Sequence, residues 1–435
     1  MIFKKETCAE GIRFYALNSE KFKASVLTFS ITVPLSTESL AYSLLLSGLL
    51  RRGTKSYPTM AILNKTLDEL YGSYLEIRSS HIGNNISFTI SSEILDNKYV
   101  PDGTDTLGGV IDIVSELLLY SSFKDGKLSS DVFEQERKIV LDSLNAETNN
   151  TRAYSVRRCM EILQLNTKHS TLEQLKELVT SATPESVLAY YKSIIFSAPL
   201  DVYYVGATDS SFIKERILSA FSSYPYKEAS ASLSPVTQAP KQELICKEEK
   251  MPVTQGKLTM GFNCGACISE TDGTYYTAIL MNELLGGSPS SKLFLNVREK
   301  MGLCYYCSSS YSIYTGFMIV SSGIDSKKVD VAKSAILDQL EQIKLGNISD
   351  EELDKAKKSI FNSYEQLYDS PFDLQAFYSG RMLLGISATI DECKKRIGAL
   401  TAEMISELAK RTTLQAVFFV KGTKKYSEEE VPTDE

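Results

Sequence analysis

The sequence predicts an α+β protein built from two similar domains, and three observations lead to this fold class. The chain has 435 residues, which is enough for more than one domain at about 150 residues each. Hydrophobic residues make up 43% and charged residues 23%, as in a soluble protein with a sizeable core. A pattern of strands followed by long helices occurs once in each half of the chain. This order favours α+β over an alternating, doubly wound sheet.

The first predicted elements of the two halves have the same spacing of apolar residues. Apolar residues alternate with more polar ones from Leu27 to Val33 and again from Leu258 to Cys264, as a half-buried strand requires. Apolar residues at helical spacing then predict a helix over 40–49 in the first half and over 275–285 in the second. Because the two copies stay about 230 residues apart, two domains of one fold are the simplest account.

The later elements repeat as well. In each copy a further predicted helix ends in a charged turn that is followed by a glycine, Gly72 or Gly302. A hairpin of two strands comes next. Long amphipathic helices are predicted over 107–120 and 130–147, and over 327–343 and 350–367. Ser349 and Glu352 form a capping-box pattern at the start of the last of these. Each domain is therefore expected to be a mixed β-sheet covered by helices.

A segment of small and polar residues separates the two copies. Residues 228–242 are rich in serine and contain Pro235 and Pro240, a composition typical of an exposed linker. We therefore expect an N-terminal domain at 1–227 and a C-terminal domain at 243–435.

Composition and charge argue against several classes of function. The formal net charge is −7 with no block of Lys and Arg, so nucleic-acid binding is not expected. The two histidines, His81 and His169, are far apart, which argues against a zinc site held by histidines. No secretory signal is visible, and the most apolar stretch, 40–50, is too short and too polar to span a membrane. The eight cysteines then indicate reduced thiols in a cytoplasmic protein.

One stretch resembles a known enzyme family. It reads Leu-Leu-Gly-Gly-Ser-Pro-Ser-Ser-Lys-Leu-Phe over 284–294 and Arg-Glu-Lys-Met-Gly-Leu-Cys-Tyr over 298–305. The pitrilysin, insulinase and mitochondrial processing peptidase family (inverzincin metallopeptidases) has similar segments in this order. The likeness covers nearly the whole chain, including 349–357 and the segment from Arg52 to Pro58. It implies two homologous metallohydrolase-like domains arranged as a clamshell.

The chain departs from this family at the zinc site. Family enzymes carry His-x-x-Glu-His on a helix, where the histidines bind zinc and the glutamate activates water. The segment 52–54 resembles the end of that helix, and this alignment places Leu44, Ser47 and Gly48 at the three positions. Leucine, serine and glycine cannot perform this chemistry, so the N-terminal domain is expected to hold a degenerate zinc motif.

The third zinc ligand is also missing from the alignment. Family enzymes place a glutamate seven residues after a position that corresponds here to Glu136, and this chain has Ser143 there. A register shifted by one gives Asp142 instead, but a lone carboxylate would bind zinc poorly. The chain alone is therefore expected to bind no metal and to hydrolyse no peptide.

A second family feature is present in the C-terminal domain. In paired family members, the subunit without zinc carries an Arg-x₆-Tyr pair that contacts the substrate backbone beside the metal of its partner. Arg298 and Tyr305 have this spacing. A guanidinium and a phenol are good donors to a carbonyl oxygen that gains negative charge, so both residues are expected to support catalysis. The alternative is that Arg298 ends a helix and Tyr305 packs on a strand.

Glycines and cysteines suggest two further sites. Gly286 and Gly287 correspond to a longer glycine-rich substrate loop in the non-catalytic processing-peptidase subunit, although a helix C-cap explains them equally well. Cys264, Cys267, Cys304 and Cys307 invite comparison with a zinc ribbon. Residues three apart on a strand point to opposite faces, however, so we expect no metal there and read Cys264 as core.

Two classes of function follow from the resemblance. In the first, the chain is the substrate-contacting, non-catalytic subunit of a heterodimeric peptidase. Its partner is a homologous subunit that binds zinc, and its substrate is a peptide or an unfolded polypeptide. Bacterial relatives of this kind are linked to modification of an elongation factor or to peptide maturation. In the second, the chain is a non-proteolytic scaffold or interaction protein.

Overall fold

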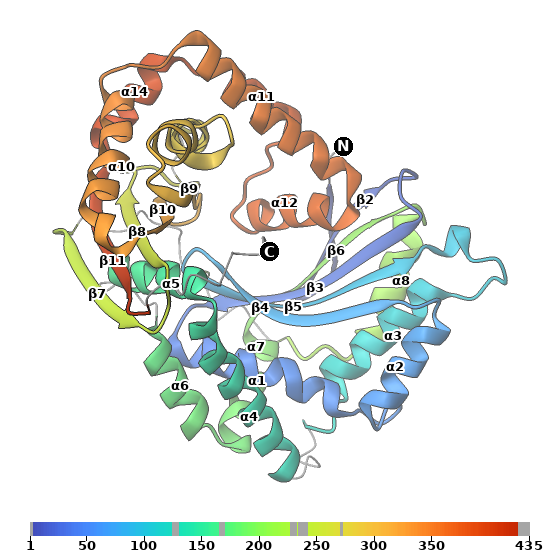
Figure 1. Ribbon diagram of the computed structural model, residues 1–435. Helices are drawn as coiled ribbons and strands as arrows, with labels where there is room; N and C mark the ends of the chain where they lie inside the picture. The colour runs from blue at the N-terminus through green and yellow to red at the C-terminus, as the bar shows by residue number, and fades with distance from the viewer. Residues whose placement is uncertain are drawn as a thin grey trace. The chain divides into compact units, whose positions relative to one another are not determined.

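The computed structural model describes residues 3–123, 130–164, 170–226, 233, 242–269 and 273–424 (Figure 1). The chain forms two compact units. Unit 1 comprises Met1–Asn145, Lys168–Pro235 and Glu365–Thr389, and unit 2 comprises Ala146–Thr167, Val236–Tyr364 and Ile390–Glu435. Each unit therefore contains stretches from both halves of the sequence. The compact units differ in this respect from the contiguous ranges 1–227 and 243–435, and the expected linker 228–242 lies almost wholly outside the described residues.

Unit 1 contains a six-stranded mixed sheet in the order β1-β2-β6-β3-β5-β4. Its strands are β1 (Lys4–Ala9), β2 (Ile12–Asn18), β3 (Ala24–Pro34), β4 (Tyr74–Ile82), β5 (Asn85–Leu95) and β6 (Leu200–Gly206). Strands β2 and β6 are parallel, and the other neighbours are antiparallel.

Unit 2 contains a five-stranded sheet in the order β7-β11-β8-β10-β9. Its strands are β7 (Ile245–Met251), β8 (Gly256–Asn263), β9 (Cys304–Tyr311), β10 (Phe317–Ile324) and β11 (Thr413–Gly422). Only β7 and β11 are parallel, so this sheet has the connectivity of the first sheet without β1. The register agrees too: Phe29 lies opposite Ile90 in unit 1, and Met260 lies opposite Val320 in unit 2. The predicted repeat and the α+β class are confirmed.

Helices cover both sheets. Those of unit 1 are α1 (Thr37–Leu49), α2 (Met60–Glu69), α3 (Thr106–Leu119), α4 (Ser130–Ala146), α6 (Leu172–Ser181), α7 (Pro184–Ser197), α8 (Ser210–Ala220) and α12 (Pro371–Leu383). Those of unit 2 are α5 (Thr151–Leu163), α9 (Thr274–Asn282), the π-helices η4 (Glu283–Gly287) and η5 (Leu293–Lys300), α10 (Val329–Lys344), α11 (Asp350–Gln366), α13 (Ile390–Gly398) and α14 (Ala402–Arg411). Short 3₁₀ helices are η1 (Leu50–Arg52), η2 (Asn97–Tyr99), η3 (Glu147–Asn149), η6 (Ser326–Lys328) and η7 (Leu367–Asp369).

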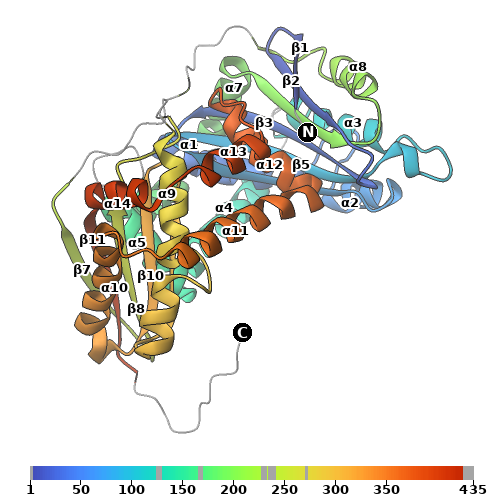
Figure 2. The ribbon, with the colours of Figure 1, turned by 90° about the horizontal axis from the view of Figure 1, so that it is seen from above.

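Neighbouring helices pack side by side within each unit. Helices α3 and α8 are adjacent in unit 1, and α9 and α14 are adjacent in unit 2 (Figure 2). The predicted helices over 40–49, 107–120, 130–147, 327–343 and 350–367 all form, with ends shifted by a few residues. The capping box also forms, because the Glu352 backbone N–H donates to Ser349 Oγ at 3.2 Å and Ser349 N–H donates to Glu352 Oε2 at 2.9 Å. Among the described residues, no helix combines the length and apolarity needed to cross a membrane.

Each sheet is completed by a helix from the other half of the chain. Helix α5 packs on β8 and β11 of unit 2, and α12 packs on β3 and β6 of unit 1 (Figure 1). The two exchanged helices occupy matching places in the repeat, because each follows a long helix and a 3₁₀ turn: α4, η3 and α5 in one half, and α11, η7 and α12 in the other. Each sheet therefore carries helices that arrive from both halves.

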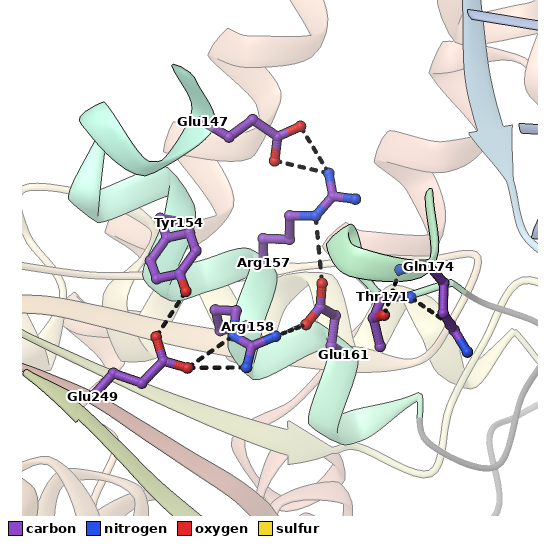
Figure 3. A network of polar contacts seen from close by, with 8 residues as sticks. All are labelled: Glu147, Tyr154, Arg157, Arg158, Glu161, Thr171, Gln174 and Glu249. Carbon is purple, nitrogen blue, oxygen red and sulfur yellow. Dashed lines mark hydrogen bonds and ion pairs between the residues drawn. The ribbon is translucent and has the colours of Figure 1, made fainter. Parts of the chain in front are cut away.

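Polar contacts anchor α5 to its sheet. Glu249 of β7 accepts hydrogen bonds from Tyr154 Oη at 2.7 Å and from Arg158 Nη2 at 2.9 Å (Figure 3). Arg157 of the same helix pairs with Glu147 at 2.9 Å. These charge-assisted bonds fix the helix along β7 and leave the glutamates neutralised.

The expectation that the first long strand is half-buried is wrong. Thr28, Ser30 and Thr32, the polar residues of β3, are only 4%, 6% and 4% exposed. Their hydroxyls have partners, because Thr28 Oγ1 donates to Gln375 Oε1 of α12 at 3.2 Å and Ser30 Oγ lies 2.7 Å from Ser87 Oγ. These three hydroxyls lie on the face of β3 that is predicted to be exposed, and their burial is tolerated because each is hydrogen-bonded.

Candidate functional site

The degenerate zinc motif lies on α1 in unit 1. Ser36 caps this helix, because Ser39 N–H donates to Ser36 Oγ at 2.9 Å and Ser36 N–H donates to Ser39 Oγ at 2.8 Å. Leu44, Ser47 and Gly48 lie in its last two turns, where each is partly exposed. Ser47 Oγ donates to the Ser43 carbonyl at 2.8 Å, so this hydroxyl is used within its own helix.

Helix α4 places a buried glutamate against Gly48. Glu136 is 6% exposed, and a Cβ built at position 48 would overlap its carboxylate. Arg52, which follows α1 in η1, forms an ion pair with Glu136 through both Nε and Nη2. The space next to Gly48 is thus occupied by a neutralised carboxylate, and a larger residue at position 48 cannot fit without moving it.

These residues do not fit a zinc ion. The Glu136 carboxylate is already paired with a guanidinium, whose positive charge opposes a bound cation. Ser143 is exposed seven residues further along α4, about 10 Å away at 1.5 Å per residue, and Asp142 is exposed too. His81 is exposed on β4, while His169 lies outside the described residues. No group of three or more His, Cys, Asp or Glu that could hold a metal occurs among the residues that the structure describes.

Arg298 and Tyr305 lie on either side of one turn in unit 2. Arg298 belongs to η5, which ends in a left-handed Gly302 with a φ of 58°. Gly302 N–H donates to the Arg298 carbonyl at 3.2 Å, and Leu303 N–H donates to the Val297 carbonyl at 3.2 Å. The turn leads directly into β9, which carries Tyr305. Backbone hydrogen bonds therefore fix the two residues on one rigid connection.

Tyr305 occupies a β-bulge. Cys304 pairs with Ile324 and Tyr306 pairs with Gly323, so Tyr305 has no opposite residue on β10. A bulge turns the side chain of its extra residue and is frequent beside functional sites. Tyr305 is accordingly 52% exposed, although β9 lies in a sheet whose neighbouring strand β10 is fully buried. This bulge could not be predicted from the sequence, because the alternation of polar and apolar residues in β9 is weak.

The surroundings of Arg298 leave its guanidinium accessible. Its side chain is 39% exposed, with Cζ 4.7 Å from the centre of the Phe294 ring and Nε 3.6 Å from Glu299. The repeat gives a comparison: Gly72 N–H donates to the Asp68 carbonyl at 3.1 Å in unit 1, so Asp68 stands where unit 2 has Arg298. The same turn forms with an aspartate, and the fold itself therefore does not require the arginine.

Gly286 and Gly287 are the last two residues of η4, and neither has a positive φ. They therefore do not form the left-handed cap that often ends a helix. Gly286 is buried, and a Cβ there would lie 2.7 Å from the backbone nitrogen of Ser309 in β9. At Gly287 an added Cβ would meet the Glu283 carboxylate at 2.6 Å, a flexible neighbour. Gly286 thus permits close packing of η4 on β9.

The two cysteine pairs are far apart. Cys307 lies opposite Ser322, which lies opposite Leu258, whereas Cys264 follows the far end of β8. Six residues of strand separate these rows, about 20 Å, so one metal ion cannot reach both pairs. The expectation that Cys304 and Cys307 point to opposite faces is wrong, because the bulge at Tyr305 brings both into the buried face. Cys264 is fully buried, in agreement with its assignment to the core.

The Arg52–Glu136 pair is the part of the site that the sequence did not reveal. In the sequence, Arg52 and Glu136 only help to align the chain with the family. Their contact joins η1 to α4, which are far apart along the chain. The glycine at position 48, one turn before Arg52, is the signal that could have indicated it.

Comparisons with known proteins agree with this geometry. A family profile described as "Peptidase M16 inactive domain" matches residues 181–360. The Bacillus subtilis protein "Probable inactive metalloprotease YmfF" is 29% identical over 418 residues, which cover 95% of this chain and 96% of that protein. "Uncharacterized zinc protease YmxG", also of Bacillus subtilis, is 24% identical over 316 residues, 69% of this chain and 71% of that protein.

A solved structure has the same fold over the whole chain. It is described as a conserved protein from Enterococcus faecalis V583, has a TM-score of 0.87 and 25% identity, and covers 98% of this chain and 100% of that one. The resemblance found in the sequence is thereby confirmed. The chain is an M16-type peptidase homologue that is similar to the inactive members of the peptidase M16 family.

Proposed function

We propose that this chain is the non-catalytic, substrate-contacting subunit of a heterodimeric metallopeptidase whose partner carries the zinc site. The observation that carries the proposal is a contrast between two places. At the zinc position, Gly48 and the Arg52–Glu136 pair leave no ligand set. Arg298 and Tyr305, by contrast, are exposed donors on a fixed turn.

The chemistry of the two donors supports this role. During peptide hydrolysis the scissile carbonyl oxygen gains negative charge, and preorganised donors stabilise that charge. Arg298 offers a planar fork of N–H groups, and Tyr305 offers a phenol hydroxyl held on a bulge. The partner would supply the zinc and the general base, and this chain would supply donors and a surface for a peptide or unfolded polypeptide. A zinc-bearing relative of similar length, of the kind that YmxG exemplifies by name, is the expected partner.

Continuous variation of the two subunits tests the proposal. The chain is mixed with a zinc-bearing homologue from the same genome at constant total concentration, and hydrolysis of a quenched peptide is followed. We expect neither protein alone to turn over the peptide, and the rate to peak at a mole fraction of one half. Activity that rises in proportion to the zinc-bearing protein, with no dependence on this chain, would contradict the proposal and favour a non-proteolytic scaffold.

Metal content provides an independent check. We expect zinc in the purified complex at one ion per pair and none in this chain purified alone. Stoichiometric zinc in the isolated chain, measured by elemental analysis, would overturn the assignment of the metal to the partner.

A further inference from the structure

Two cations share one aromatic ring on the sheet of unit 2. The guanidinium carbon of Arg152 lies 4.1 Å from the centre of the Tyr306 ring, and Lys257 Nζ lies 5.5 Å from it. Arg152 Nη2 also donates to Ser308 Oγ at 3.1 Å, and Lys257 Nζ contacts Gln255 Oε1. These partners are neutral. Within the described residues neither cation has a carboxylate partner, so the cluster carries two uncompensated positive charges.

The other two arginines of α5 differ from Arg152, because they pair with carboxylates. Arg157 and Arg158 of α5 each bind glutamates (Figure 3). Arg152, at the start of the helix, has no such partner among the described residues. Burial, together with the charge of Arg152, lowers the pKa of Lys257 below its ordinary value. The two cations therefore repel each other, and a bound anion would relieve that repulsion.

The repeat provides a control within the molecule. In unit 1 the equivalent helix α12 places Phe372 over Arg78 of β4, with a ring-to-Cζ distance of 5.4 Å. There Glu76 lies 3.6 Å from Arg78 and supplies the counter-charge. The strand registers place Ser308 where unit 1 has Glu76, and Lys257 where unit 1 has Val26. In unit 2 a neutral serine thus stands at the position of the acid, and a lysine stands at the position of a valine.

The described chain ends beside this cluster. Val420, Lys257, Gly323 and Tyr306 lie in one row across β11, β8, β10 and β9, so Val420 is about 14 Å from Tyr306 at the usual strand spacing. Gly323 has no side chain, and a Cβ there would lie 2.6 Å from the Tyr306 ring. Beyond β11, Lys424 N–H donates to the Val253 carbonyl at 3.2 Å, two residues before Gln255. The last described residues therefore lie at the edge of the sheet where the cations lie.

The residues that follow are acidic. Glu428, Glu429 and Glu430 begin four positions after Lys424, and Asp434 and Glu435 come next. A chain reaches about 3.3 Å per residue, so the first glutamates lie within range of Lys257 and Arg152. Attachment to the same chain gives them a high effective concentration at the cluster.

We propose that Arg152, Lys257 and Tyr306 form a carboxylate-binding site whose occupant is the acidic segment Glu428–Glu430 of the same chain. Arg152 and Lys257 bind the carboxylates, and the Tyr306 ring holds both cations in place from below. The segment then covers the face of β8, β10 and β9 next to the start of α5. This inference is independent of the proposed function, because it involves neither Arg298 nor Tyr305.

Zero-length cross-linking of the full chain tests the proposal. A carbodiimide and a proton convert a glutamate carboxylate to an O-acylisourea, the neutral Lys257 amine attacks its carbonyl carbon, and an amide forms as the urea by-product leaves. Mass spectrometry then identifies peptides that join Lys257 to residues 425–435. Lys424 serves as the matched control, since it is nearer to the segment along the chain.

We expect Lys257 to be linked more often than Lys424. Arg152→Ala should lower the Lys257 product about two- to fivefold, the change that one exposed ion pair contributes, and leave the Lys424 product unchanged. The triple variant Glu428→Gln, Glu429→Gln, Glu430→Gln should abolish it, and 0.5 M salt should reduce it by screening. A thermal melt of each variant confirms that the fold is kept.

An equal mixture of ¹⁵N-labelled and unlabelled chains identifies the occupant. Products that join only labelled to labelled and unlabelled to unlabelled peptides support binding within one chain. Mixed products at Lys257 would show that a second copy is bound and would overturn the proposal as stated. A Lys257 product no more abundant than that of Lys424, or one that Arg152→Ala leaves unchanged, would also overturn it.

Discussion

The single residue Asp96, which follows β5, links the end of this strand to the loop after β6 through hydrogen bonds. Its side chain is fully buried and accepts hydrogen bonds from Thr208 Oγ1 at 2.7 Å, from the backbone N–H groups of Lys98, Ala207 and Thr208 at 3.0 Å each, and from Ser25 Oγ. Burial raises the pKa of Asp96, but the bonds from Ser25 and Thr208 outweigh it and leave the pKa below its ordinary value of 3.8.

Asp96→Asn should lower the free energy of unfolding by about 2–3 kcal/mol at pH 7, because the new amide N–H₂ faces donors instead of accepting from them. A carboxyl with a lowered folded pKa stabilises the fold above its unfolded pKa and loses that contribution as the pH falls through the folded value. The difference between wild type and variant should therefore shrink below about pH 4. Urea unfolding at both pH values measures it.

Asp112→Asn is the control for this prediction. Asp112 is 53% exposed and pairs with Arg216 at 2.9 Å, so its loss should change the unfolding free energy by less than about 1 kcal/mol. Equal effects of the two substitutions at pH 7 would show that the hydrogen bonds of Asp96 contribute little.

Gly48 gives a second prediction at this scale. Alanine normally stabilises a helix by about 1 kcal/mol over glycine, but here its Cβ would overlap the Glu136 carboxylate. Gly48→Ala should therefore destabilise the protein by about 1–3 kcal/mol. In a Glu136→Ala background the same change should instead become neutral or favourable, and chemical denaturation of the four proteins gives this cycle. A stabilising effect of Gly48→Ala in the wild-type background would show that the carboxylate moves aside freely.

The two glycines at the end of η4 could serve the packing of this element or the binding of substrate, and substitutions distinguish the two roles. Gly286→Ala should destabilise the fold by about 1–3 kcal/mol, since its Cβ would lie 2.7 Å from the Ser309 backbone nitrogen. Gly287→Ala should cost less than about 1 kcal/mol, because Glu283 can rotate away. Melting temperatures of both variants measure this. If Gly286→Ala keeps wild-type stability and lowers only peptidase turnover of the reconstituted pair, the pair of glycines is a substrate loop.

Some elements could be predicted from sequence and others could not, for physical reasons. Helices α4, α10 and α11 have one apolar stripe each, so their period is visible along the chain. The bulge at Tyr305 leaves no such trace, because one inserted residue only interrupts a short alternation. The partners of α5 and α12 were also hidden, since periodicity shows that a helix has a buried face and not which sheet covers it. The zinc positions were found by alignment, but the Arg52–Glu136 contact depends on the packing of two helices.

The exchanged helices have a consequence for the whole molecule. Helix α5 precedes the segment 228–242, yet it packs on β8 and β11, which follow that segment. Helix α12 has the reverse arrangement on β3 and β6. A chain cut between 228 and 242 should therefore give two fragments on a denaturing gel and a single species in size-exclusion chromatography. Separation of the fragments without denaturant would mean that the exchanged helices contribute little to the cohesion of the protein.

We propose that this chain lends two donors, Arg298 and Tyr305, to a zinc site in another subunit. The most direct measurement is turnover of a quenched peptide by the reconstituted pair carrying Tyr305→Phe or Arg298→Ala. Tyr120→Phe is the control, because Tyr120 is 47% exposed and its hydroxyl lies 2.8 Å from Oγ of the surface residue Ser223, remote in sequence from the Arg298–Tyr305 turn. We expect each test variant to keep its melting temperature and its association with the partner, and to lose about 100- to 1,000-fold in turnover, as when an oxyanion donor is removed. Undiminished turnover with both variants would contradict the claim.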